Sequence, residues 1–108
     1  MVRQLKEVEE IVRTVIGIIN QRYPVRAAYL FGSYVDGVPR DDSDIDIAIF
    51  AEGIESEDID TRMDFIAQVQ KVIGAEIELH LFPAALLNEL RPTNFPGYIS
   101  AHGKKIAA

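Results

Sequence analysis

Apolar residues recur at helical spacing in two parts of the chain. Between residues 2 and 21, valine, leucine and isoleucine occupy every third or fourth position, and charged residues fill the other face. This spacing predicts an amphipathic helix over about residues 2–21, which ends before Tyr23 and Pro24. A second run with the same spacing predicts a helix over about residues 57–73, with Gly74 as its end.

Three other segments have the composition of strands. Residues 25–31 (VRAAYLF) and residues 44–51 (DIDIAIFA) are mostly apolar, whereas residues 76–82 (EIELHLF) alternate between polar and apolar positions. Alternation with a period of two is typical of a strand with one buried face, and a continuous apolar run is typical of a strand that is buried on both faces.

Short helices are predicted between and after these strands. Ser33 can cap a short helical turn that Gly37 and Pro39 end, a short helix spans residues 84–90, and a last short helix with a tail spans residues 98–108. The order is helix, strand, turn, strand, helix, strand, helix. It predicts an α/β (α+β) fold, with helices packed on a small mixed β-sheet.

The composition limits the class of protein and the kind of metal site. A chain of 108 residues that is 48% hydrophobic can form one core, so we expect a single domain over residues 1–108. There is no cysteine, which excludes disulfides and thiolate metal sites. Any metal must therefore be held by oxygen or histidine ligands, and hard ions such as Mg²⁺ or Mn²⁺ fit best.

The charge argues against a nucleic-acid-binding protein. The formal net charge is −6, so the molecule as a whole repels polyanions, and broad nucleic-acid binding is not expected. A small anion such as a nucleotide can still bind locally, because distant charges are screened over about 8–10 Å. The start of the chain lacks the apolar core of a signal peptide, and no apolar run approaches the length of about 18 residues that a membrane span needs. We expect a cytoplasmic protein with no membrane partner.

Two aspartates interrupt the second apolar run. Asp44 and Asp46 are two residues apart, so in a strand they share a face at a separation of about 7 Å. Unpaired carboxylates at this separation repel one another, which predicts a cation between them. A turn or strand edge is the alternative, since Asp41 and Asp42 beside them are typical of a loop. That alternative does not explain Asp46, which stands between two isoleucines.

A glycine–serine pair and two glutamates complete the candidate site. Gly32 and Ser33 follow the first predicted strand, and a glycine there lets backbone N–H groups approach phosphate oxygens. Glu76 and Glu78 share one face of the third strand; a solvated strand face is the alternative, and Glu78 is the better candidate ligand of the two. If the strands are neighbours, one glutamate joins the two aspartates. Three carboxylates suit magnesium and the two-metal chemistry of nucleotidyl transfer.

Residues 28–50 resemble the signature of the DNA polymerase β-like nucleotidyltransferase superfamily, in which GS is followed by ten residues and then DxD; here ten residues separate Ser33 from Asp44. The short chain is most similar to the minimal nucleotidyltransferase (MNT) group, antitoxin-like proteins paired with HEPN-domain partners. The resemblance implies the polymerase β-like fold. It also implies that Gly32 and Ser33 hold the phosphates of an NTP, and that Asp44 and Asp46 bind both metal ions.

Two residues depart from the family's pattern. Asp36 stands where the family often has a basic residue, so a positive charge facing the phosphates would have to come from Arg40. Glu78 stands where the family usually has aspartate, and the resemblance implies that it binds the metal ion that activates the acceptor.

The resemblance implies an enzyme. It would move AMP from ATP onto a hydroxyl acceptor, such as a tyrosine side chain of a HEPN partner, with release of pyrophosphate. The alternative is a non-catalytic antitoxin that blocks its partner by contact and keeps the site as a relic or a nucleotide sensor. Asp36 supports this alternative, whereas the intact GS and DxD argue against it. The acceptor, the base preference and the presence of a homo-oligomer are left open.

Other residues carry polar or aromatic groups for which a structural or solvated role is favoured over a functional one. They are Tyr34, His80, His102, Lys104 and Lys105. The acidic run over residues 52–60 is predicted to be a solvated loop, and it could also contact a basic partner.

Overall fold

The chain folds around a four-stranded mixed sheet. The computed structural model describes residues 4–39, 44–74 and 76–107. The strands are β1 (Val25–Phe31), β2 (Ile45–Ala51), β3 (Ile77–Pro83) and β4 (Lys104–Ala107). Their order across the sheet is β3-β2-β1-β4. β2 is parallel to β3 and antiparallel to β1, and β1 is antiparallel to β4, so the sheet is mixed as predicted.

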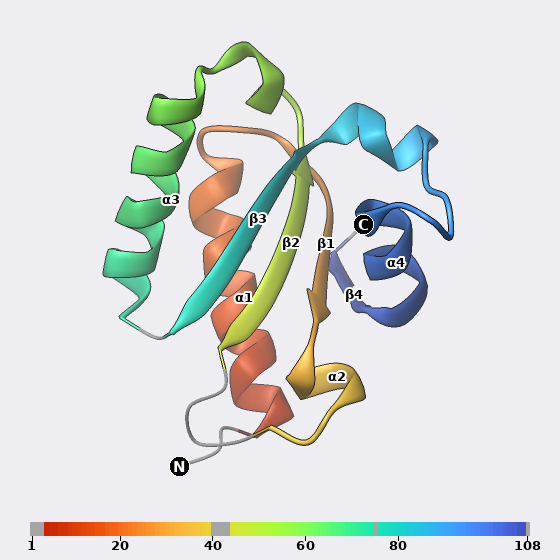
Figure 1. The fold of residues 1–108 in the computed structure, drawn as a ribbon. Coiled ribbons are helices and arrows are strands. Elements are labelled where there is room, and N and C mark those ends of the chain that lie inside the picture. Colours follow the sequence, from red (N-terminus) through yellow and green to blue (C-terminus); the bar gives the residue numbers. More distant parts are fainter. Residues whose placement is uncertain (1–3, 40–43, 75, 108) are drawn as a thin grey trace.

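Helices pack on both faces of this sheet (Figure 1). The α-helices are α1 (Leu5–Asn20), α2 (Ser33–Asp36), α3 (Ile59–Ile73) and α4 (Phe95–His102), and two 3₁₀ helices are η1 (Ile54–Ser56) and η2 (Ala84–Asn88). The predicted α/β class is therefore confirmed. Among the described residues, no helix has the length and hydropathy that crossing a membrane would require.

α1 and α3 cover one face of the sheet. The stripe of apolar residues predicted for the first helix is fully buried at Val8, Val12, Val15 and Ile19. Ile45, Ile47 and Ile49 of β2 belong to the same core, together with Phe65 and Val69 of α3. Removal of these side chains from water is the main force that holds the two helices on the sheet.

α4 and η2 cover part of the opposite face. Tyr29 of β1 and Phe50 of β2 are buried there around Ile99 of α4, which is fully buried. Asp46 lies on this face of β2 as well, because it is an even number of residues from Phe50. It is half-buried, so the beginning of β2 stays accessible to solvent on this face.

The fourth strand was not predicted. Lys104 and Lys105, predicted to be solvated residues of a tail, are exposed but belong to β4 on the edge of β1. Lys104 Nζ lies 2.7 Å from Glu9 Oε2 of α1. The prediction of a tail was wrong because a run of four residues with two lysines has little strand propensity of its own. Hydrogen bonds to β1 make it a strand.

The acidic segment before α3 is more ordered than predicted. Ile54 is fully buried in η1, so residues 52–60 are not a simple solvated loop. α3 begins at Ile59 instead of residue 57, because the side chain of Asp58 accepts a hydrogen bond from Thr61 N–H at 2.7 Å and caps the helix. Its end at Gly74, which has a φ of 69°, is as predicted.

The two short helices near the C-terminus also differ from the prediction. Residues 84–88 form the 3₁₀ helix η2 instead of a longer helix over residues 84–90. α4 begins at Phe95, three residues before the predicted start, because Asn94 caps it by accepting a hydrogen bond from Gly97 N–H at 2.8 Å.

Candidate active site

A sharp turn at Gly32 joins β1 to α2. Gly32 has a φ of 78°, which side-chain-bearing residues rarely adopt, and its carbonyl accepts a hydrogen bond from Val35 N–H at 2.9 Å. A Cβ built at this position would collide with the carboxylate of Asp46. Glycine is thus required both for the backbone conformation and for space. Ser33, which was predicted as the helix cap, is instead the first residue of α2, and Gly32 is its N-cap.

Asp46 belongs to β2, which lies between the two other strands that carry the candidate site. It is the second residue of β2, and it pairs with Phe31 of β1 on one side and with Glu78 of β3 on the other. Paired residues on neighbouring strands share a face of the sheet. The structure therefore brings together the end of the first strand and one carboxylate from each of the next two strands.

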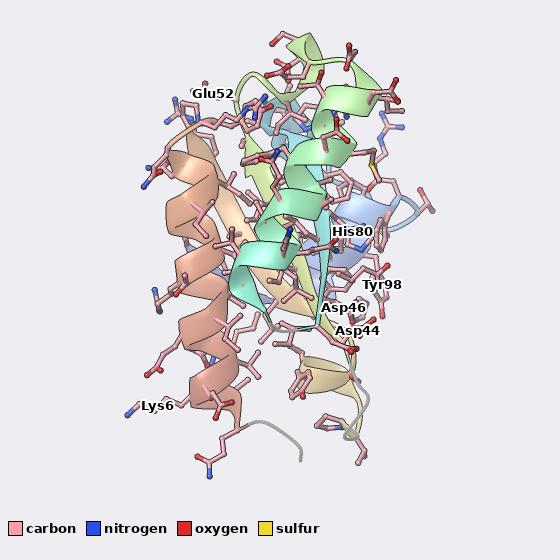
Figure 2. All side chains as sticks on the ribbon, turned by 90° about the vertical axis from the view of Figure 1, so that its left-hand side faces the viewer. Lys6, Asp44, Asp46, Glu52, His80 and Tyr98 are labelled. Carbon is pink, nitrogen blue, oxygen red and sulfur yellow. The ribbon has the colours of Figure 1, made fainter. Side chains whose placement is uncertain are left out.

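Asp44 is exposed and immediately precedes β2. The predicted strand began at Asp44, whereas the observed strand begins at Ile45. Figure 2 shows Asp44 and Asp46 close together in the lower half of the molecule. Arg40, Asp41 and Asp42, which were considered above, lie outside the residues that the structure describes.

The two glutamates of the third strand have different positions. Glu78 is directly beside Asp46, and its side chain is 57% exposed, so its carboxylate can reorient toward a ligand. Glu76 precedes β3, and its carbonyl accepts a hydrogen bond from Ile45 N–H at 2.9 Å. Register thus favours Glu78 over Glu76 as the partner of Asp46, although its role as a metal ligand stays a prediction.

An aromatic cluster that sequence reasoning did not identify adjoins Glu78. His80 Nε2 lies 3.6 Å from Glu78 Oε1, and the imidazole ring packs against Phe31 and Phe95 with ring centroids 5.6 and 5.5 Å apart. His80 is half-buried, in agreement with a structural role. The alternation of residues 76–82 already places His80 on the face of Glu78, but only the fold brings Phe95 to it.

The donor set suits a hard cation, but the site is not preassembled around one. In residues 4–39, 44–74 and 76–107, no group of three acidic or histidine side chains is arranged closely enough to hold a metal ion. Asp46 and Glu78 still present carboxylate oxygens from adjacent strands, which are the ligands that Mg²⁺ and Mn²⁺ prefer. Asp44 and Glu78 are both exposed, so their side chains have room to change conformation.

Tyr34 follows the glycine–serine pair, and both a packing role and a nucleotide contact were considered for it. It is partly buried and packs on the core under α1 and α3. The packing role is observed, and a contact with nucleotide stays untested.

A solved structure shares this fold. The crystal structure of a toxin–antitoxin with AMP-PNP superimposes on the chain with a TM-score of 0.60 at 23% identity, over 88% of this chain and 71% of that chain. At this identity the likeness shows the fold alone. The fold is that of the polymerase β-like nucleotidyltransferases, as the resemblance implied.

The chain belongs to the polymerase beta nucleotidyltransferase family, whose sequence model matches residues 13–94. Protein adenylyltransferase MntA of Thermococcus cleftensis is 31% identical over 78 residues, which are 69% of this chain and 74% of the relative. MJ1379 of Methanocaldococcus jannaschii, also named for protein adenylyltransferase activity, is 30% identical over 77 residues, 71% of this chain and 77% of the relative. The family recognised from residues 28–50 is therefore confirmed.

Proposed function

We propose that this chain transfers AMP from ATP to a hydroxyl group on a partner protein. The observation that carries the proposal is the position of Gly32, whose backbone lies against Asp46 while Asp46 pairs with Glu78. The proposed phosphate-binding turn is thus in contact with one of the carboxylates proposed for a metal ion, and nucleotidyl transfer needs both groups near one another. The names of the two relatives favour a protein as the acceptor.

The residues have separate tasks in this proposal. Gly32 and Ser33 hold the β- and γ-phosphates through backbone N–H groups and the serine hydroxyl. Asp44 and Asp46 would hold the metal ion that carries the triphosphate, and Glu78 with them would hold the metal ion that activates the acceptor hydroxyl. A bound Mg²⁺ or Mn²⁺ would neutralise charge on the triphosphate and lower the pKa of the acceptor hydroxyl.

The proposed reaction exchanges a phosphoanhydride bond of ATP for a phosphoester bond to the acceptor. The acceptor oxygen bonds to the α-phosphorus of ATP, and the bond between that phosphorus and the bridging oxygen of the β-phosphate breaks. Pyrophosphate leaves with the bonding electrons, and the hydroxyl proton passes to solvent. We propose a HEPN-domain protein as the partner and the cytoplasm as the location. A tyrosine of the partner is the proposed acceptor.

Transfer of label from α-³²P-ATP to a purified HEPN partner tests this proposal. Glu78→Gln keeps the size of the side chain but removes a ligand charge, so we expect a loss of transfer of about a hundredfold or more with ATP binding retained. Glu76→Gln is the matched control and should transfer nearly as the wild type does. Glu78→Asp should retain activity, since it keeps the charge.

The outcomes of this assay separate the candidates. Loss of transfer in Glu76→Gln instead of Glu78→Gln would mean that the assignment of Glu78 as the third metal ligand is wrong. An absence of transfer by the wild type, with equal ATP binding by all variants, would favour the non-catalytic antitoxin.

A further inference from the structure

The two edges of the sheet differ in how they are protected. β4, on one edge, has four residues and begins with Lys104 and Lys105, which discourage pairing with another chain. β3, on the other edge, pairs with β2 at seven successive positions without a bulge. Its central residues, from Leu79 to Phe82, include no lysine or proline. Long, regular edge strands without such protection are the ones that accept an added strand.

The free backbone groups of β3 can be assigned from one hydrogen bond. Ile45 N–H donates to the carbonyl of Glu76 at 2.9 Å. In a parallel pair, alternate residues direct both backbone groups to the same neighbour, so Leu79 and Leu81 direct theirs away from β2. Gln70 Nε2 of α3 donates to the carbonyl of Ile77 at 3.0 Å, which agrees with this assignment. Among the described strands, none pairs with this outer edge.

A groove runs along this edge between β3 and α3. It has a volume of about 520 Å³, and α3, which provides its helix side, faces the viewer in Figure 2. Ile59, Met63 and Ile66 line its helix side at a spacing of four and three residues. Ile59 is 68% exposed and Met63 is 58% exposed, which is unusual for large apolar side chains.

A residue that lines the groove carries an unsatisfied donor. Arg62 lines it, and within the described part of the chain its Nε–H is buried without a hydrogen-bond partner. A buried donor without an acceptor costs free energy, so native structures rarely leave one. A carbonyl group of a bound segment would reach this donor only after the Arg62 side chain turns toward the groove, because the atom is shielded from solvent.

We infer that β3 pairs with an extended segment of a partner protein, which adds a fifth strand and lays its apolar side chains against Ile59 and Met63. The segment carries basic residues at the end that meets α3's first turns, because Asp60 and Asp64 are exposed on the same turns, outside the groove lining, and Glu78 lines the groove itself. A second copy of this chain is a poorer occupant, because each copy has a net charge of −6 and their like charges repel.

The inferred surface adjoins the candidate active site. Glu78 and His80 line the same groove, so a strand on β3 would pass beside the carboxylate proposed for the acceptor side. The inference rests on the proposed function only in identifying the partner as the acceptor protein. The added strand itself is a matter of binding, and it is measured without ATP or metal.

A labelled peptide of alternating valine and threonine, with two lysines at one end, serves as the probe in fluorescence anisotropy. Two versions place the lysines at the first or the last positions, since the direction of the added strand is open. We expect one version to bind, and the version with glutamates instead of lysines to bind at least about tenfold more weakly. The double change Ile59→Ser, Met63→Ser should also weaken binding at least about tenfold.

Val72→Ser is the matched control for this double change. Val72 is 73% exposed on the same helix but does not line the groove, so its substitution should leave the affinity unchanged. N-methylation of alternate peptide amides tests the strand pairing: methylation of the set that faces β3 should abolish binding, and methylation of the other set should not.

Three results would overturn the inference. The first is an absence of saturable binding up to about 1 mM peptide. The second is an equal loss of affinity for the two N-methylated sets. The third is a wild type that self-associates and that the Ile59→Ser, Met63→Ser double change converts to the monomer. The last result would make a second copy the occupant. If Glu78→Gln binds the peptide but does not transfer AMP, both the binding surface and the proposed role of Glu78 are supported. If the wild type binds the peptide but transfers no AMP, the proposed function is wrong and the inferred binding surface still holds.

Discussion

The backbone of Gly32 lies directly against the carboxylate of Asp46, and no side chain can be placed between them. Gly32 directly follows β1 and Asp46 is the half-buried second residue of β2, so two residues that are fourteen positions apart in the sequence share one small space. This contact is a physical reason for a sequence signature that combines a glycine–serine pair with a later aspartate. Changes at either residue should therefore affect the same site.

Gly32→Ala should remove metal binding with only a modest loss of stability. Alanine at a positive φ costs about 1 kcal/mol, and its Cβ would turn the Asp46 side chain away from its present position. Gly74→Ala is the matched control, since its φ is 69° but nothing lies within 4 Å of the added Cβ. Urea unfolding should show similar losses for both variants, within about 1 kcal/mol. Only Gly32→Ala should lose the rise in Tm that Mn²⁺ causes. If Gly32→Ala keeps this rise, Gly32 does not contribute to the metal site.

Mg²⁺ or Mn²⁺ should raise the Tm of the wild type, because binding to the folded state alone stabilises it. Asp44→Asn together with Asp46→Asn removes both charges from the site and should abolish this rise while circular dichroism shows the same fold. Asp60→Asn together with Asp64→Asn, on exposed positions of α3, should keep it. An equal response of both double variants to metal would show that the ion binds elsewhere.

Stability should fall above about pH 10 because of Tyr23. Burial raises the pKa of Tyr23, and the hydrogen bond that its hydroxyl donates to Glu57 at 3.0 Å raises it further. The folded state therefore holds this proton at a pH where the unfolded chain has lost it. The resulting stabilisation is full at neutral pH and is lost as the pH rises through the pKa of the folded state. Tyr23→Phe should flatten the alkaline slope in denaturant unfolding, and an unchanged slope would assign the effect to another group.

Asp58 should contribute to stability in the opposite pH range. Hydrogen bonds from the side chain and the backbone N–H of Thr61 lower the pKa of Asp58. Its contribution is therefore present above about pH 4 and is lost as the pH falls through the lowered value in the folded state. Asp58→Ala should have a lower urea midpoint than the wild type at pH 7, and the difference should disappear in strong acid. Asp58→Asn, which can still cap α3, should show a smaller loss with little pH dependence.

Much of the fold could be predicted because its signals are local. Apolar residues at a spacing of three and four predicted α1 and α3, since a helix with one apolar face has only one way to bury it. The apolar run over residues 44–51 predicted a buried strand, which the structure has from Ile45 to Ala51, and the position of Asp46 within it pointed to a site. The caps at Asp58 and Asn94 were missed, although both residue types favour the start of a helix.

The sequence by itself determined the helices, three strands, the glycine turn and the candidate aspartates, because each depends on residues that are near one another in the chain. Only the tertiary structure decided that β3 is parallel to β2, and this places Glu78 beside Asp46 and leaves the outer edge of β3 open. It also made residues 104–107 a strand, through hydrogen bonds to β1. Strand order and pairing depend on contacts between distant segments, whose free energy comes from burial and hydrogen bonds that no local pattern encodes.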